Sequence, residues 1–407
     1  MQKVDLVSQD FKRNPLPTFA ALREQGSLIE TRLPIMGRAF ITTDYETTVA
    51  VLRDSNRFVT GAHNAGRKRY AGMQWWMPRM LTTLANNMLT KDDPDHRRLR
   101  KLAESAFLRQ SVDEMRPRLA QLANSLVDQA EAIAKRDGHV DFVEHFARPF
   151  PLAVISELLG LPEEDRPVFG KWGAALTQTN SVLGIFRFLP LLRKMYRYFD
   201  RQFAECRRNP RPGLLTALVQ AEQEGEQLSH DELIAFAFLL LFAGHETTVH
   251  LMSGGILTLL DHPAQKADLL GDWSLGERAV QEILRYYCPV QMTKPRYIRD
   301  DTEVAGVTLR RGEMISAILA AANLDPQEFE NPEAFDIRRH PNPHVAFGTG
   351  MHVCLGMKLA NAETETAFEC LFSRFPNLEL AVPASELVWA KRIGLRGLAK
   401  LPLRLNP

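Results

Sequence analysis

The segment "AGHETTVH", Ala243 to His250, contains the residue types that bind zinc in many proteases. A zinc-binding helix needs its two histidines at positions i and i+4, which lie about 40° apart around the helix axis. Here His245 and His250 are five residues apart, and they project about 140° from each other. One helix cannot direct both side chains at one ion, so the spacing argues against a zinc site here.

Glu246, Thr247 and Thr248 need another explanation, because they follow an apolar run from Leu233 to Ala243. A carboxylate on a core helix is costly unless it is paired or faces water. Threonine hydroxyls can bond to backbone carbonyls and bend a helix, and a glycine just before them weakens the helix further. We therefore expect a local distortion beside a cavity, which is either a proton path or a water-filled kink without chemistry.

A second segment that could do chemistry is "AFGTGMHVCLGMKLANAETETAF", which begins at Ala346. Cys354 stands just before or at the start of a predicted helix, where free backbone N–H groups favour a thiolate. Gly350 and Gly356 leave room for a flat group to approach the backbone. A Walker loop would need Gly-Lys-Ser/Thr, and GxGxxG would need a glycine at Val353. A lone cysteine before a helix can also be a small buried hydrophobic residue.

The spacing of Phe347, Gly350, Cys354 and Gly356 resembles F-x-x-G-x-x-x-C-x-G, the haem-ligand signature of the cytochrome P450 family. Further segments resemble this family in its order along most of the chain. They are "DDPDHRRLRKLAESAF", "AGHETT", "EILR", "KPRYIRDDTEVAGVTLRRGE" and "NPEAFDIRRHPNPHVAFG". The resemblance implies a mainly α fold, with a helical bundle around haem and small β-sheets at its edge.

The resemblance also implies which residues hold haem b. Cys354 would be the thiolate ligand of the iron, and a thiolate favours O–O cleavage. Phe347 would shield the sulfur, and backbone N–H groups near Gly356 would tune its electron donation. The two propionates would be bound by His96, Arg100, Arg296 and His352. Gly244 and Gly350 complete the expected cofactor-binding set.

Thr247 and Glu246 correspond to the alcohol and the acid that deliver protons in the family. Such delivery is general acid catalysis through water. Relatives that use peroxide often lack this pair, so its presence favours O2 and external electrons. The implied reaction is hydroxylation of an apolar small molecule. A haem-thiolate peroxygenase or isomerase without external electrons, and a haem- or ligand-binding protein without turnover, stay open.

Glu282 and Arg285 are spaced i, i+3, which suits a salt bridge on a helix. In the family this pair braces the segment before the cysteine loop. Its usual third partner comes from a P-x-R-F motif, but Ala334 occupies that position in "PEAF". The third partner therefore stays open between His344 and Arg338.

The substrate pocket is the least specific prediction. The segment "GRKRYAGMQWWMPRMLTTLANNML" aligns with the family's variable loop over the haem, and it is either an apolar lid or ordinary surface packing. His245 is next to the catalytic pair and is a further candidate. The predicted pocket residues are Trp76, Met80, Ala243, Val290, Met292 and Leu395.

The elements that position these residues are mostly predicted helices. Apolar residues recur at helical spacing in "RLRKLAESAF", "MRPRLAQLANSLVDQAEAIA" and "ELIAFAFLLLFAGHETTVHLMSGGILTLL". Strand-like runs are short: "RAFITT", "VAGVTLRRGEMISAIL" and "LELAV". Residues 323–343 read as an ordered meander. We expect one mainly helical haem-binding domain over residues 1–407.

Composition limits the remaining function classes. The chain is 45% hydrophobic and 24% charged with a net charge of +1, so bulk charge does not indicate nucleic acid. The polar start and the absence of a long enough apolar run predict no signal peptide and no membrane anchor. Four dispersed cysteines favour a reducing, cytoplasmic setting. The sequence ends shortly after the family's final segment, so we expect electrons from a separate ferredoxin or flavodoxin with an NAD(P)H-dependent reductase.

Overall fold

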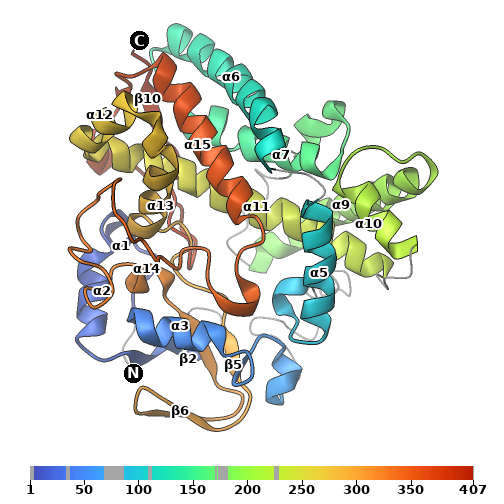
Figure 1. Cartoon of the computed structure of the whole chain (residues 1–407), viewed down its shortest axis with the longest axis vertical. Coiled ribbons are helices and arrows are strands. Elements are labelled where there is room, and N and C mark those ends of the chain that lie inside the picture. Colours follow the sequence, from blue (N-terminus) through green and yellow to red (C-terminus); the bar gives the residue numbers. More distant parts are fainter. Residues whose placement is uncertain are drawn as a thin grey trace.

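Helices dominate the described residues of the computed structural model, which are 4–33, 37–67, 87–108, 112–169, 172, 182–223 and 229–406 (Figure 1). The helices are α1 (Gln9–Arg13), α2 (Leu16–Arg23), α3 (Tyr45–Arg53), α5 (Asp95–Leu108), α6 (Val112–Asp137), α7 (Pro149–Leu159), α9 (Val182–Arg208), α10 (Leu214–Gln223), α11 (His230–Asp261), α12 (Pro263–Gly271), α13 (Gly276–Tyr286), α14 (Leu319–Ala322) and α15 (Met357–Arg374).

The strands form small sheets, and the sheet that contains β2 and β5 lies at the opposite end of the molecule from the sheet that contains β10 (Figure 1). The largest sheet has the order β1-β2-β8-β5-β3, in which only β2 and β8 are parallel. A second sheet has the order β4-β10-β9, and β6 pairs with β7. The strands are β1 (Leu28–Leu33), β2 (Gly37–Thr42), β3 (Phe58–Val59), β4 (Val140–Asp141), β5 (Arg296–Ile298), β6 (Thr302–Val304), β7 (Val307–Leu309), β8 (Met314–Ala317), β9 (Glu379–Leu380) and β10 (Pro402–Arg404).

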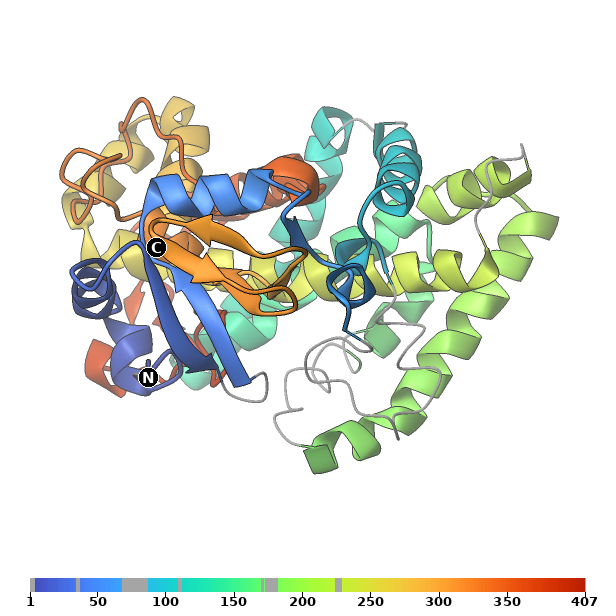
Figure 2. The ribbon, with the colours of Figure 1, turned by 90° about the horizontal axis from the view of Figure 1, so that it is seen from below.

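Helix α11 runs through the middle of the molecule (Figures 1 and 2). A capping box fixes its start, because Ser229 and Glu232 each bond to the other's backbone N–H. Its first half, from Leu233 to Leu241, packs in one core cluster, and Val249 to Leu259 pack in another. The polar residues 243–248 therefore lie at the junction of two cores.

Helix α11 is also long and apolar enough to cross a membrane by length and composition. Most of its apolar window, 61%, is buried inside the protein, as expected for a core helix.

The predicted helices are confirmed as α5, α6 and α11, and residues 323–343 form no helix or strand. The strand predictions are confirmed at β2, β7 and β8, but "LELAV" shortens to Glu379–Leu380. Strand β1 was not predicted. Helix α11 is continuous over residues 230–261, so the expected distortion does not break the helix.

Candidate active site

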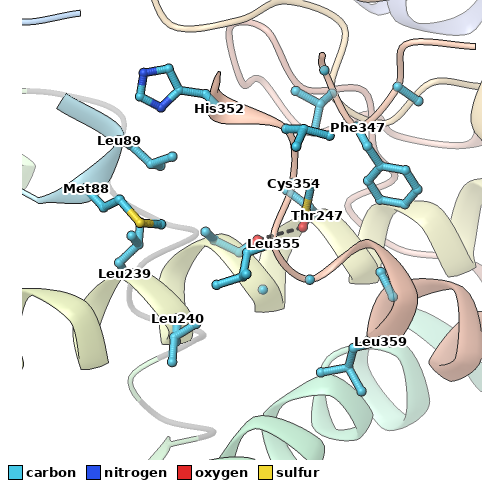
Figure 3. Close-up of a pocket in the computed structure, with 18 of the residues that line it drawn as sticks. Met88, Leu89, Leu239, Leu240, Thr247, Phe347, His352, Cys354, Leu355 and Leu359 are labelled. Atoms are coloured by element: carbon cyan, nitrogen blue, oxygen red, sulfur yellow. Dashed lines mark hydrogen bonds between the residues drawn. The ribbon is translucent and has the colours of Figure 1, made fainter. Parts of the chain in front are cut away.

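A cavity of about 360 Å³ opens where α11 passes between the two core clusters. This volume is in the range of small-molecule sites. Its walls come from α5, α11, the segment before β5 and the loop before α15 (Figure 3). The predicted site residues that line it are His96, Arg100, Ala243, Gly244, Thr247, Val290, Arg296, Phe347, His352, Cys354 and Gly356.

Other predicted residues lie beside the cavity or outside the described residues. Glu246, Gly350, Met292 and Leu395 do not line the cavity. Val290 and Leu395 instead form an isolated β-bridge, and the N–H of Met292 donates to the carbonyl of Gly394 at 3.3 Å. Trp76 and Met80 lie outside the described residues, as do Trp75 and Met77.

Cys354 projects from the loop that precedes α15 (Figure 3). The loop is closed by two backbone bonds, from Cys354 N–H to Phe347 O at 3.0 Å and from Val353 N–H to Gly350 O at 3.1 Å. The cysteine is exposed, and it reaches solvent through the cavity. Burial nevertheless raises the pKa of the Cys354 thiol, although the N–H of Gly356 and the charge of Arg100 oppose this. The rise in the Cys354 pKa caused by burial is therefore larger than the fall that we expected from the start of helix α15.

The three glycines expected near the cofactor have different surroundings. A side chain at Gly356 would meet nothing within 4 Å, so this residue leaves open space on the wall. A Cβ at Gly244 would lie 3.1 Å from Ile155 Cδ1. Gly350 has φ +74°, and a Cβ there would lie 2.5 Å from the carbonyl oxygen of Leu52. Gly350 is therefore required by its packing against α3.

His96, Arg100, Arg296 and His352 gather at one part of the wall. The rings of His96 and His352 are 4.4 Å apart in an edge-to-face contact. Burial lowers the pKa of both imidazoles, that of His352 to about 3. Arg100 donates to Val353 O and Glu104, both at 2.6 Å, and Arg296 donates to Val51 O and Leu52 O at 3.0 Å.

The donors at this wall fit the haem group that the resemblance implies. His96 Nε2 and both ring nitrogens of His352 are buried without a hydrogen-bond partner among the described residues. Buried polar atoms normally have partners, so such orphaned nitrogens indicate a ligand with polar groups. Two guanidinium groups lie on the same wall, where carboxylates would be neutralised. A free thiol in the same cavity supplies a soft metal ligand.

Thr247 is on the cavity side of α11, and its hydroxyl donates to Ala243 O at 2.7 Å (Figure 3). Thr248 makes the same kind of bond to Gly244 O at 2.8 Å. Both hydroxyls bond one turn back along their own helix, which satisfies them without a break in α11.

Glu246 points to a different group of residues. Its carboxylate lies 3.1 Å from Arg392 Nε and 3.9 Å from His250 Nε2. Burial raises the pKa of Glu246, and the charge of Arg392 opposes this rise. The sequence indicated that this acid needs a partner, but Arg392, which is 146 residues away in sequence, could not be identified from it. His245, a further pocket candidate, is buried and does not line the cavity.

The Glu282–Arg285 pair is fully buried and doubly bonded, at 2.8 and 2.7 Å. Arg285 also donates to the carbonyl of Ala334 at 2.8 Å, so the backbone at this position is tied to the pair. Arg339 Nε donates to Glu282 Oε1 at 3.2 Å and is the third partner. The two residues considered from sequence are wrong: His344 bonds to Gln281, and Arg338 bonds to Asp268.

Sequence reasoning missed several cavity residues. Lys294 and Glu363 bring charge to the wall, and Met88, Leu89, Leu239 and Leu240 bring apolar surface. The apolar residues show no local signal that separates them from core residues. In the described residues no group of three or more His, Cys, Asp or Glu side chains could hold a metal ion, so nothing supports the zinc interpretation there.

Comparisons with known proteins agree with the motif on the cavity wall. The sequence model of the family described as Cytochrome P450 matches residues 42–272 and 266–382. The chain is 36% identical to the polyketide biosynthesis cytochrome P450 PksS of Bacillus subtilis, with 98% of this chain and 97% of the relative covered. It is 37% identical to the cytochrome P450 monooxygenase PikC of Streptomyces venezuelae, with 98% and 92% covered.

Solved structures that resemble this chain are also cytochrome P450 structures. The PksS structure matches with a TM-score of 0.88, covering 98% of this chain and 99% of that one. The structure of P450BioI with an acyl carrier protein ligated to hexadec-9Z-enoic acid matches with a TM-score of 0.87 at 34% identity, covering 98% and 100%. Since both kinds of comparison extend over nearly the whole chain, this protein belongs to the cytochrome P450 family of haem-b monooxygenases.

Proposed function

We propose that this monooxygenase hydroxylates an apolar small molecule in the cavity, with Cys354 as the thiolate ligand of the iron. The observation that carries the proposal is that Cys354 and Thr247 come from distant segments and line one cavity (Figure 3). Haem, when bound, supplies the activation of O2 and the transfer of one oxygen atom. The protein supplies the sulfur ligand, the anchoring groups and a proton route.

The haem would be anchored along the wall that carries His96, Arg100, Arg296 and His352. These side chains would bind the propionates, which would give the orphaned imidazole nitrogens partners. Phe347 would pack against Cys354, whose own N–H is already bonded to Phe347 O. Gly356 and Gly244 would let the macrocycle approach the backbone, because both line the cavity and lack a side chain.

Thr247 and Glu246 would deliver protons. The hydroxyl of Thr247 uses its proton in the bond to Ala243 O, so its oxygen is free to accept a hydrogen bond from the cavity side. Glu246 does not line the cavity, so its proton would cross to Thr247 through water. Arg392 would hold the carboxyl in place, and burial raises its pKa toward the range useful for an acid.

The substrate would be a hydrophobic small molecule. Met88, Leu89, Leu239 and Leu240 form an apolar wall (Figure 3). Two relatives support the class: one is named vitamin D(3) 25-hydroxylase, and the myxobacterial CYP267B1 was solved with myristic acid. Val290, Met292, Leu395 and Ala243 remain proposed contacts, of which Val290 and Ala243 line the cavity.

Electrons would come from a separate ferredoxin or flavodoxin and its NAD(P)H-dependent reductase. We also propose that residues 1–407 act as one haem domain in the cytoplasm. The test is reconstitution of the purified holoenzyme with a ferredoxin, a reductase, NADPH and labelled O2. A product that carries one labelled oxygen atom is expected. Product formation with hydrogen peroxide but none with the electron chain would contradict the proposal and support a peroxygenase.

A further inference from the structure

Lys294 lies on the cavity wall, and the proposed function gives it no role. The backbone around it is fixed on both sides. Thr293 exchanges two hydrogen bonds with Ala317 of β8, at 2.9 and 3.0 Å. Arg296 is bonded to two carbonyl oxygens of α3 at 3.0 Å. The Lys294 side chain therefore starts from a rigid segment, which reduces the entropy cost of binding a ligand.

The ammonium of Lys294 makes no hydrogen bond or ion pair with the described residues. The side chain is exposed, yet burial lowers its pKa. The side chain can be exposed and still be surrounded by protein atoms because it faces the cavity. Outside the described residues, Glu224 and Glu226 are the only acidic side chains, and the segments 68–86, 109–111 and 170–181 contain none. A charge that faces a cavity and has no partner among the described residues is available to bind a charged ligand.

The pKa of Lys294 is lowered by burial, without a contribution from the basic residues proposed to anchor haem. His96, Arg296 and Arg100 all contribute to the lowered pKa of His352, so each of them lies within range of that imidazole. None of them contributes to the lowered pKa of Lys294, for which burial is the cause. The only acidic residue among the described cavity residues, Glu363, does not contribute either.

We propose that Lys294 binds the carboxylate of the substrate, and that the preferred substrate is an apolar molecule carrying an acid group. This inference rests on the proposed function and narrows its substrate class. The apolar wall of Met88, Leu89, Leu239 and Leu240 would take the hydrocarbon part. The ammonium and the carboxylate would form a charge-assisted hydrogen bond, which is the strong class of such bonds.

The test compares acids with neutral analogues of the same chain length. Straight-chain acids from octanoic to hexadecanoic acid, and their methyl esters, are titrated into the ferric holoenzyme by spin-shift spectroscopy and by calorimetry. At least one acid is expected to bind about 10- to 100-fold more tightly than its ester, as a charged hydrogen bond implies. Lys294→Met should remove this preference and leave the Kd of the ester within about 2-fold. Lys294→Arg should keep the preference.

Lys400→Met is the matched control, because Lys400 is exposed and does not line the cavity. The proposal is overturned if no acid binds more tightly than its ester, or if Lys294→Met keeps the preference. It is also overturned if Lys294→Met releases haem faster to apomyoglobin with the preference intact, since Lys294 would then bind a propionate. Wild-type protein that purifies without haem would instead contradict the proposed function.

Discussion

The threonine on the cavity side of α11 can be tested against a second threonine on the same helix. Thr247 and Thr258 both donate to the carbonyl four residues earlier, at 2.7 and 2.8 Å. Only Thr247 lines the cavity, whereas Thr258 is buried in the core. A difference between variants at these positions therefore reports on the cavity and not on the helix.

We predict that Thr247→Ala keeps its haem but forms about 10-fold less product per NADPH consumed, because general acid groups contribute at least this much. The lost electrons should appear as hydrogen peroxide. Thr258→Ala should keep the ratio of product to NADPH near that of the wild type. Equal coupling in the two variants would mean that the Thr247 hydroxyl has no part in proton delivery.

The sequence predicted the residues that belong to short, contiguous motifs. Phe347, Gly350, Cys354 and Gly356 were recognised by spacing alone. Partners that come from elsewhere in the chain were not predictable. Arg392 reaches Glu246 from a loop near the C-terminus, and Arg339 was missed beside its neighbour Arg338. Which of two adjacent arginines turns inward depends on the path of the folded backbone.

At the scale of elements, periodicity predicted α5, α6 and α11 but not the 27-residue α9, and it predicted the short strands poorly. Strand β1 was not predicted because Glu30 and Arg32 interrupt its apolar pattern. Glu30 is paired with Arg38 across the hairpin, a contact that no local pattern reveals. Helix α11 is also unbroken at its polar segment. Its threonine hydroxyls bond within the helix, so the polar segment is accommodated without a break.

The segment that leads to the cysteine loop is tied to α13 by the Glu282 network. Arg339 has a side chain that is 12% exposed and bonds to the buried Glu282, whereas Arg338 is 54% exposed and pairs with Asp268. We predict that Arg339→Ala lowers the free energy of unfolding by about 1–3 kcal/mol, since Glu282 loses a charged partner.

Arg338→Ala is the neighbouring control and should change the free energy of unfolding by less than about 0.5 kcal/mol, as is usual for surface positions. Urea unfolding of both holoenzymes, followed by circular dichroism, gives the comparison. Similar losses in the two variants would contradict the assignment of Arg339 as the third partner.

At the scale of the whole molecule, the cavity proposed as the active site lies where two hydrophobic cores meet. Helix α11 contributes to both core clusters, and its residues Ala243, Gly244, Thr247 and Thr248 line the cavity between them. Hydropathy along the chain predicts that a helix is buried, but not that its two halves belong to different cores. The cavity, and lining residues such as Lys294 and Glu363, therefore became visible only in the folded structure.

Glu363 makes the stability of the molecule depend on pH. It is fully buried, its Oε2 has no partner among the described residues, and burial raises its pKa well above the usual value. The folded protein then binds this proton more tightly than the unfolded chain does. The resulting stability is fully present below the unfolded pKa and is lost as the pH rises through the folded pKa.

We predict that Glu363→Gln, which cannot lose a proton, flattens this dependence. Between about pH 5 and about pH 8, the urea midpoint of the variant should fall less than that of the wild type, by an amount equivalent to at least about 1 kcal/mol. Glu365→Gln serves as the control, because Glu365 is paired with Arg116 at 2.8 Å. Parallel pH profiles for the wild type and Glu363→Gln would show that the buried carboxyl is not the cause.

The most direct test of the account is the optical spectrum of the reduced protein with carbon monoxide, measured on the wild type, Cys354→Ser and Cys370→Ser. Cys370 is also a free cysteine, but it does not line the cavity. We expect the red-shifted Soret band of a haem thiolate in the wild type and in Cys370→Ser, and its loss in Cys354→Ser. A red-shifted band that persists in Cys354→Ser would contradict it.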